Sequence, residues 1–200
     1  MVIGLTGNIA SGKSTVAQYL RDKGFQVLDM DNETHIIYQR GNCGYNAIKE
    51  EFGDRFVDPD GTLNRAKLGK YVFADRARLK RLNEIIHPLL VKRAGEFIRT
   101  HKDERAVFIE AYGIIEAGML DMLDRLWLVA ADEKLRLARL MERGLDEHQA
   151  KLRIDAQMSE DKKKKYASCI IDTGGSFEDT FAQVDACLKK EGLLRDETEA

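Results

Sequence analysis

Short apolar runs alternate with amphipathic stretches along most of this chain. The runs have the length of buried strands, and they lie at 2–5, 26–28, 106–110, 126–129 and 169–171. Strands separated by helices need crossover connections, which favour a parallel sheet covered on both faces. We therefore predict an α/β fold with a five-stranded parallel sheet.

Helical periodicity is clearest outside these runs. The first helix is expected to end at Gly24, and the last one places Phe177, Phe181, Val184 and Leu188 on one face, which predicts core packing. The polar tail after Lys189 is expected to fray.

Two regions interrupt the alternation. Between Gly53 and Thr100 we expect two amphipathic helices, with Pro88 in the first turn of the second one. The region from about Arg139 to Tyr166 is highly charged and is typical of a helical lid. The expected parts are a strand–helix core (1–57, 101–136 and 167–200), a helical insertion (58–100) and a charged helical region (137–166).

The loop after the first apolar run carries a phosphate-binding pattern. Residues 7–14 fit G-x-x-x-x-G-K-[ST] between a strand and a helix. Gly7 and Gly12 permit a tight turn, and successive N–H groups form an anion nest at the positive end of the helix. Lys13 can reach the terminal phosphates and Ser14 can hold Mg²⁺. The predicted nucleotide-binding residues here are Asn8, Ile9, Ala10, Ser11, Gly12, Lys13, Ser14 and Thr15.

Carboxylates follow two of the predicted strands. Asp29 and Asp31 would face the same side if the segment were extended, so that one orients metal-bound water and the other accepts a proton from a substrate hydroxyl. The alternative is an ordinary turn or helix cap. Glu110 ends the third strand, where it is either a second metal-orienting carboxylate or an ordinary strand-end residue.

The charged region supplies candidate groups for phosphoryl transfer. Arg139, Arg143 and Arg153 are candidates to stabilise charge on the transferring group, with a solvated helix face as the alternative for each. The run of four lysines at 162–165 is expected to lie in solvent, because four consecutive residues cannot share one helix face.

Bulk composition narrows the class of protein. The chain has 200 residues, 32 basic and 34 acidic, and a formal net charge of -2, which argues against nucleic acid or an anionic membrane as the main partner. No apolar stretch approaches a membrane span, and no signal segment is evident. Cys43, Cys169 and Cys187 are widely spaced and odd in number, so we expect no disulfide framework and a reduced, cytoplasmic protein.

Together, six motifs resemble the dephospho-coenzyme A kinase family from Val2 to about Leu188. They are LTGNIASGKS at 5–14, DMD at 29–31, DGTLNR at 60–65, IIHP at 85–88, a lid pattern at Arg139, Arg143, Arg153 and Gln157, and IIDTG at 170–174. The resemblance implies a three-layer P-loop kinase fold with a helical substrate-binding insertion and a helical lid.

The resemblance also implies the reaction and its residues. ATP, with Mg²⁺, would phosphorylate the ribose 3′-hydroxyl of dephospho-coenzyme A, with Asp31 as the base. The implied catalytic residues are Asp31, Lys13, Arg139 and Arg143. The implied acceptor-binding residues are Asp31, His35, Arg65, His87 and Glu116, and the implied metal-binding residues are Ser14, Asp29 and Glu110. Asp172 and Gly174 would contact adenine, and Arg139 could cover its ring.

The chain departs from the family pattern on the acceptor and lid sides. His35 replaces an arginine, 112–115 differs from the family segment that ends in Glu116, Arg136 replaces a glutamine, and Ser168 replaces an aspartate. These departures leave open a kinase for another small hydroxyl or nucleotide acceptor, or a divergent nucleotide-binding member with weak activity. A GTPase-like switch is disfavoured, because no N-K-x-D motif accompanies the D-x-x-G patterns. The sequence does not fix the oligomeric state, and a monomer is compatible with it.

Overall fold

The chain folds into two compact units in a computed structural model that describes residues 1–194. The first unit comprises Met1–Leu28 and the chain from His101 onward, and the second is Asp29–Thr100. The second unit therefore begins well before residue 58, where we expected the helical domain to start. The end of the polar tail, at 195–200, lies outside the described residues.

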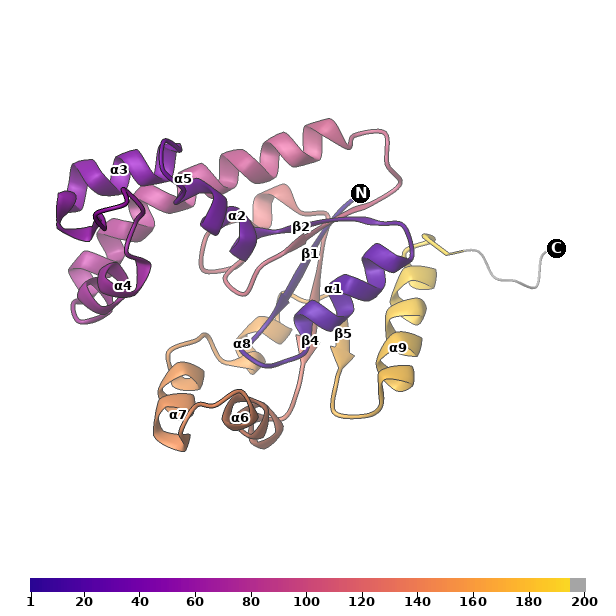
Figure 1. The fold of residues 1–200 in the computed structure, drawn as a ribbon. Coiled ribbons are helices and arrows are strands. Elements are labelled where there is room, and N and C mark those ends of the chain that lie inside the picture. Colours follow the sequence, from indigo (N-terminus) through magenta and orange to yellow (C-terminus); the bar gives the residue numbers. More distant parts are fainter. Residues whose placement is uncertain (195–200) are drawn as a thin grey trace. The chain divides into compact units, whose positions relative to one another are not determined.

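A five-stranded sheet is the centre of the first unit (Figure 1). Its strands are β1 (Val2–Gly7), β2 (Gln26–Asp29), β3 (Val107–Glu110), β4 (Arg125–Ala130) and β5 (Cys169–Asp172), in the order β2-β3-β1-β4-β5. β1 pairs in parallel with β3 and β4, and β4 pairs in parallel with β5. This sheet confirms the predicted α/β fold and brings the carboxyl ends of β1, β3 and β5 to one edge.

Five helices belong to the same unit, namely α1 (Lys13–Asp22), α6 (Glu133–Glu142), α7 (Glu147–Asp155), α8 (Glu160–Lys164) and α9 (Phe177–Lys190). The helices α1 and α9 bury Val16, Leu20, Val184 and Leu188 in a core with Trp127 of β4. Gly24 follows α1 with a φ of 88°, so a left-handed residue ends this helix as predicted. The face of α9 packs as expected except at its first residue, Phe177, which is 67% exposed.

The second unit is helical, with α2 (Met30–Ile37), α3 (Cys43–Phe52), α4 (Arg65–Phe73) and α5 (Arg76–Thr100). Ile37, Ile48, Val72 and Ile86 come from these four helices and share one apolar cluster, which explains why the unit begins before residue 58. The prediction of two helices between Gly53 and Thr100 was wrong for 76–100, because α5 continues through Pro88. The loss of one N–H bond at Pro88 is tolerated where both halves of α5 pack against the same cluster.

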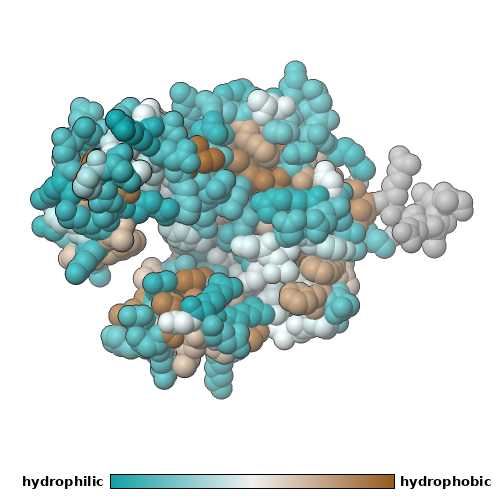
Figure 2. All heavy atoms as spheres, viewed as in Figure 1, coloured by the Kyte–Doolittle hydropathy of each residue, from teal (hydrophilic) through white to brown (hydrophobic). Residues whose placement is uncertain are grey.

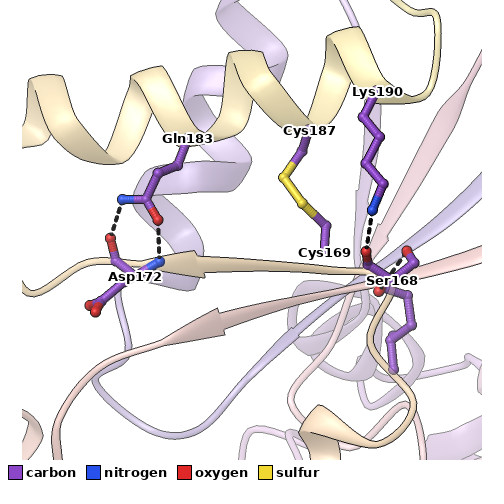
Figure 3. Close-up of a disulfide and its surroundings, with 7 residues drawn as sticks. Ser168, Cys169, Asp172, Gln183, Cys187 and Lys190 are labelled. Carbon is purple, nitrogen blue, oxygen red and sulfur yellow. Dashed lines mark hydrogen bonds between the residues drawn. A yellow bond between two sulfur atoms is a disulfide. The ribbon is translucent and has the colours of Figure 1, made fainter.

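The expectation that the cysteines form no disulfide was wrong. Cys169 of β5 and Cys187 of α9 form a disulfide with their Cα atoms 6.4 Å apart (Figure 3). Their spacing in the sequence gave no sign of pairing, and only the packing of α9 against β5 brings them together. Cys43 is exposed and is a free thiol.

Most of the visible surface is hydrophilic, and hydrophobic side chains form small separate groups (Figure 2). Within residues 1–194, no helix combines the length and the apolar character that a membrane span requires.

Candidate functional site

The loop between β1 and α1 has the curvature that phosphate binding requires. Gly12 has a φ of 86°, and Ala10 has a φ of 61°, which is uncommon for a residue with a side chain. A Cβ atom at Gly7 would lie 2.6 Å from the carbonyl oxygen of Val129, so only glycine fits there. The loop leads directly into Lys13, the first residue of α1. The loop therefore lies at the positive end of a helix.

Side chains from two other segments hold this loop in place. The backbone N–H of Ile9 donates to Gln157 Oε1 at 2.7 Å. Arg139 of α6 donates to the carbonyl oxygen of Ala10 at 3.1 Å and to that of Thr173 at 2.7 Å. Arg139 thus joins the phosphate loop to the loop after β5, a role that the sequence did not predict. These bonds connect the two loops within the first unit.

Lys13, Ser14 and Glu110 meet at the carboxyl ends of β1 and β3. The Glu110 carboxylate is 2% exposed, and its Oε1 accepts from Lys13 Nζ at 2.8 Å and from the Ser14 hydroxyl at 3.3 Å. Arg21 of α1 approaches the other carboxylate oxygen at 3.4 Å. The structure therefore brings together two of the three predicted metal-binding residues and the predicted phosphate-binding lysine.

This arrangement suits Mg²⁺. The ion prefers oxygen ligands and usually takes only one or two carboxylates, with phosphate and water completing its shell. The hydroxyl of Ser14 and the carboxylate of Glu110 supply two such oxygens side by side. Residues 1–194 hold no group of three or more His, Cys, Asp or Glu side chains that could bind a metal on their own. The site fits an ion that arrives with a nucleotide.

The segment of Asp29 and Asp31 is not extended, so the alternation argument was wrong. Asp29 is the N-cap of α2, and its Oδ1 accepts from the backbone N–H groups of Asp31 at 2.9 Å and Asn32 at 3.0 Å. Asp29 is therefore a helix cap, which was the alternative to its proposed role in orienting a metal-bound water. Asp31 lies exposed in the first turn of α2.

Three further predicted residues also belong to the second unit. His35 lies in the last turn of α2, and Arg65 is the first residue of α4; both are exposed. His87 is half-buried on α5 and lines a pocket of about 530 Å³ with Arg76 and Lys80. Burial disfavours the charged imidazolium and lowers the pKa of His87 below its usual value.

The loop after β5 borders a second pocket, of about 380 Å³, in the first unit. The residues that line it are Gly12, Thr15, Arg139, Glu142, Arg143, Thr173, Gly175, Ser176, Phe177 and Thr180. Gln183 of α9 bonds both the N–H and the carbonyl of Asp172 (Figure 3). Asp172 Oδ1 accepts from the N–H of Gly174 at 2.8 Å. This pocket brings the predicted adenine loop beside the phosphate loop.

Phe177 is a pocket residue that the sequence analysis had assigned to the core. Its ring stacks on Phe181 with a centroid distance of 6.2 Å, and Phe181 stacks on Tyr19 at 4.1 Å. Phe177 is the first residue of α9 and precedes Thr180, the first buried residue of this helix. Its exposed ring offers a flat apolar surface beside the pocket.

Lys163 was also missed. The sequence predicted all four lysines of 162–165 in solvent, but the side chain of Lys163 is fully buried. Its Nζ donates to the carbonyl oxygen of Tyr112 at 2.6 Å and lies 3.4 Å from Glu116 Oε1. Helical periodicity allows one of four consecutive residues to face inward, but four identical lysines give no sign of which one does.

Comparisons with known proteins agree with this geometry. A family model described as "Dephospho-CoA kinase" matches residues 1–179. Proteins of that name from Geobacter metallireducens and Shouchella clausii are 42% and 40% identical to this chain, each over 95% of it and over 96% and 98% of the relative.

Solved structures give the same picture. Dephospho-CoA kinase from Campylobacter jejuni is 26% identical with a TM-score of 0.71, over 94% of this chain and 96% of that one. A shikimate kinase from Bacteroides thetaiotaomicron is 13% identical with a TM-score of 0.56, over 96% and 99% of the two chains, and shares the fold alone.

Proposed function

Since this chain belongs to the dephospho-CoA kinase family, we propose that it transfers the γ-phosphoryl group of ATP to the ribose 3′-hydroxyl of dephospho-CoA. The observation that carries the proposal is the meeting of Lys13, Ser14 and Glu110 under the phosphate loop. Phosphoryl transfer depends mainly on positioning and electrostatic stabilisation, which this arrangement supplies. The products are coenzyme A and ADP.

On the nucleotide side, we assign the phosphates to the phosphate loop of residues 8–15 and to the ammonium of Lys13. Ser14 and Glu110 would hold Mg²⁺, with Asp29 as a further candidate. The ion neutralises charge on the phosphate oxygens when it is bound. The adenine would lie in the pocket lined by Arg139, Gly175 and Phe177, beside the loop from Asp172 to Gly174.

On the acceptor side, we assign Asp31 as the general base, which accepts the proton of the 3′-hydroxyl. Asp31 lies exposed in the first turn of α2, where a carboxylate can reach a substrate hydroxyl. His35, Arg65 and His87 are proposed to bind the acceptor from the second unit.

From the first unit, Glu116 is proposed to contact the acceptor. Arg143 and the rest of 137–166 are proposed to act as a lid that stabilises charge on the transferring group. We also propose a cytoplasmic location, a compartment in which a disulfide such as Cys169–Cys187 is rare.

A mass-spectrometric turnover assay with ATP, Mg²⁺ and dephospho-CoA tests the proposal. We expect a product heavier by one phosphoryl group, absent with Lys13→Ala and retained with Lys102→Ala, which removes an exposed lysine of the same unit. No product from a chain that still binds ATP would contradict dephospho-CoA as the acceptor. A panel of nucleoside monophosphates and small alcohols would then identify another acceptor.

A further inference from the structure

The buried ammonium of Lys163 has no role in the function proposed above, and its surroundings are unusual. Its side chain is fully buried on α8, a helix of the expected lid. Its two described partners, Tyr112 and Glu116, lie on the segment that follows β3. The contacts therefore join the end of the lid region to a segment about fifty positions earlier in the chain.

Keeping a charged lysine in this place is costly. Burial lowers the pKa of Lys163, and the positive charges of Lys13 and Arg136 lower it further, whereas Glu116 raises it. An apolar side chain would avoid the desolvation cost. A buried ammonium therefore indicates a role in polar contacts. Its partners are the carbonyl oxygen of Tyr112 and the carboxylate of Glu116.

The segment held by Lys163 is fixed from two sides. The carbonyl oxygen of Tyr112 accepts one bond from Lys163 and a second from the Thr6 hydroxyl of β1 at 3.1 Å. The same segment follows directly from Glu110 in the nucleotide site and carries Glu116, whose side chain remains 35% exposed. Glu116 is thus anchored on one oxygen while it stays accessible to a ligand.

We propose that Lys163 is a positioning residue that holds the segment 112–116 in place for the acceptor and couples this segment to the lid. The inference rests on the proposed function, in which Glu116 contacts the acceptor. Lys163 itself touches neither substrate. Its removal should therefore affect the acceptor more than the nucleotide.

The first test separates acceptor from nucleotide effects. Lys163→Met keeps the length of the side chain and removes its charge, and Lys162→Met is the matched control on the exposed side of the same helix. We expect Lys163→Met to raise the KM for dephospho-CoA about tenfold or more, with the Kd for ATP changed less than about twofold. Lys162→Met should match the unaltered protein. An equal change in the KM for dephospho-CoA and the Kd for ATP, or an unchanged KM for dephospho-CoA, would overturn the inference.

The second test needs no activity. Hydrogen exchange of amides in 111–118 should be faster in Lys163→Met and unchanged in Lys162→Met. If Lys163→Met does not fold, Glu116→Gln replaces it, and amides of 159–166 should then exchange faster. Unchanged exchange in the partner segment would refute the coupling. Absence of turnover by the unaltered protein would instead refute the proposed function, and the exchange result would still decide the role of Lys163.

Discussion

The disulfide between Cys169 and Cys187 is expected to stabilise the folded chain by about 3 kcal/mol. It links residues with a sequence separation of 18, and both side chains pack in the core of the first unit. In the chain-entropy model, closing a loop of this length removes about 11 cal/mol/K from the unfolded state, which is about 3 kcal/mol at 25 °C. Reduction should therefore lower the free energy of unfolding by this amount.

Urea unfolding with and without dithiothreitol measures the effect. Trp127 is the single tryptophan and is fully buried in the same core, so its fluorescence reports this unit. With a urea slope of about 2–3 kcal/mol/M, reduction should lower the midpoint by about 1 M. Comparing the same chain oxidised and reduced leaves all side chains in place. The double variant Cys169→Ala/Cys187→Ala should not respond to the reductant.

Two results would refute this reasoning. Equal midpoints with and without reductant would show that the link contributes nothing. Alkylation of the unfolded chain without reductant should label only Cys43, and labelling of all three cysteines would show that the link does not form in solution.

Three other predictions concern the proposed sites. Asp31→Asn should lower kcat about 100-fold or more while the Kd for ATP, measured by calorimetry, stays within about twofold; near-normal turnover would rule out its role as the base. Phe177→Ala should raise the KM for ATP about fivefold, since ring stacking contributes about 1 kcal/mol, and Phe73→Ala, an equally exposed ring of the other unit, should leave it unchanged. Because burial lowers the pKa of His87, the unfolded chain takes up its proton at a higher pH, so stability should fall as the pH drops below about 6.5. Melting temperatures from pH 8 to 5 should show a smaller fall in His87→Gln, and an identical fall would refute the effect of burial.

Features that depend on local backbone geometry were predictable from the amino-acid sequence alone. Gly12 has a φ of 86°, in the left-handed region that favours glycine, and the spacing of the phosphate-binding pattern marks this turn. The alternation of apolar runs and helices gave the parallel sheet, because crossover connections leave few other arrangements. Because β1 and β3 are parallel neighbours, their carboxyl ends lie at the same edge of the sheet. Glu110 at the end of β3 therefore lies beside the phosphate loop that follows β1.

Features that depend on contacts between side chains far apart in the sequence became visible only in the folded chain. Lys163 cannot be distinguished from its three neighbours by composition, and its burial follows from the place where α8 packs. The pairing of Cys169 with Cys187 requires α9 to lie along β5, and the continuity of α5 through Pro88 requires a cluster that draws on both of its halves. Each of these depends on contacts between distant segments, and such contacts leave no periodic or spacing signal in a single sequence.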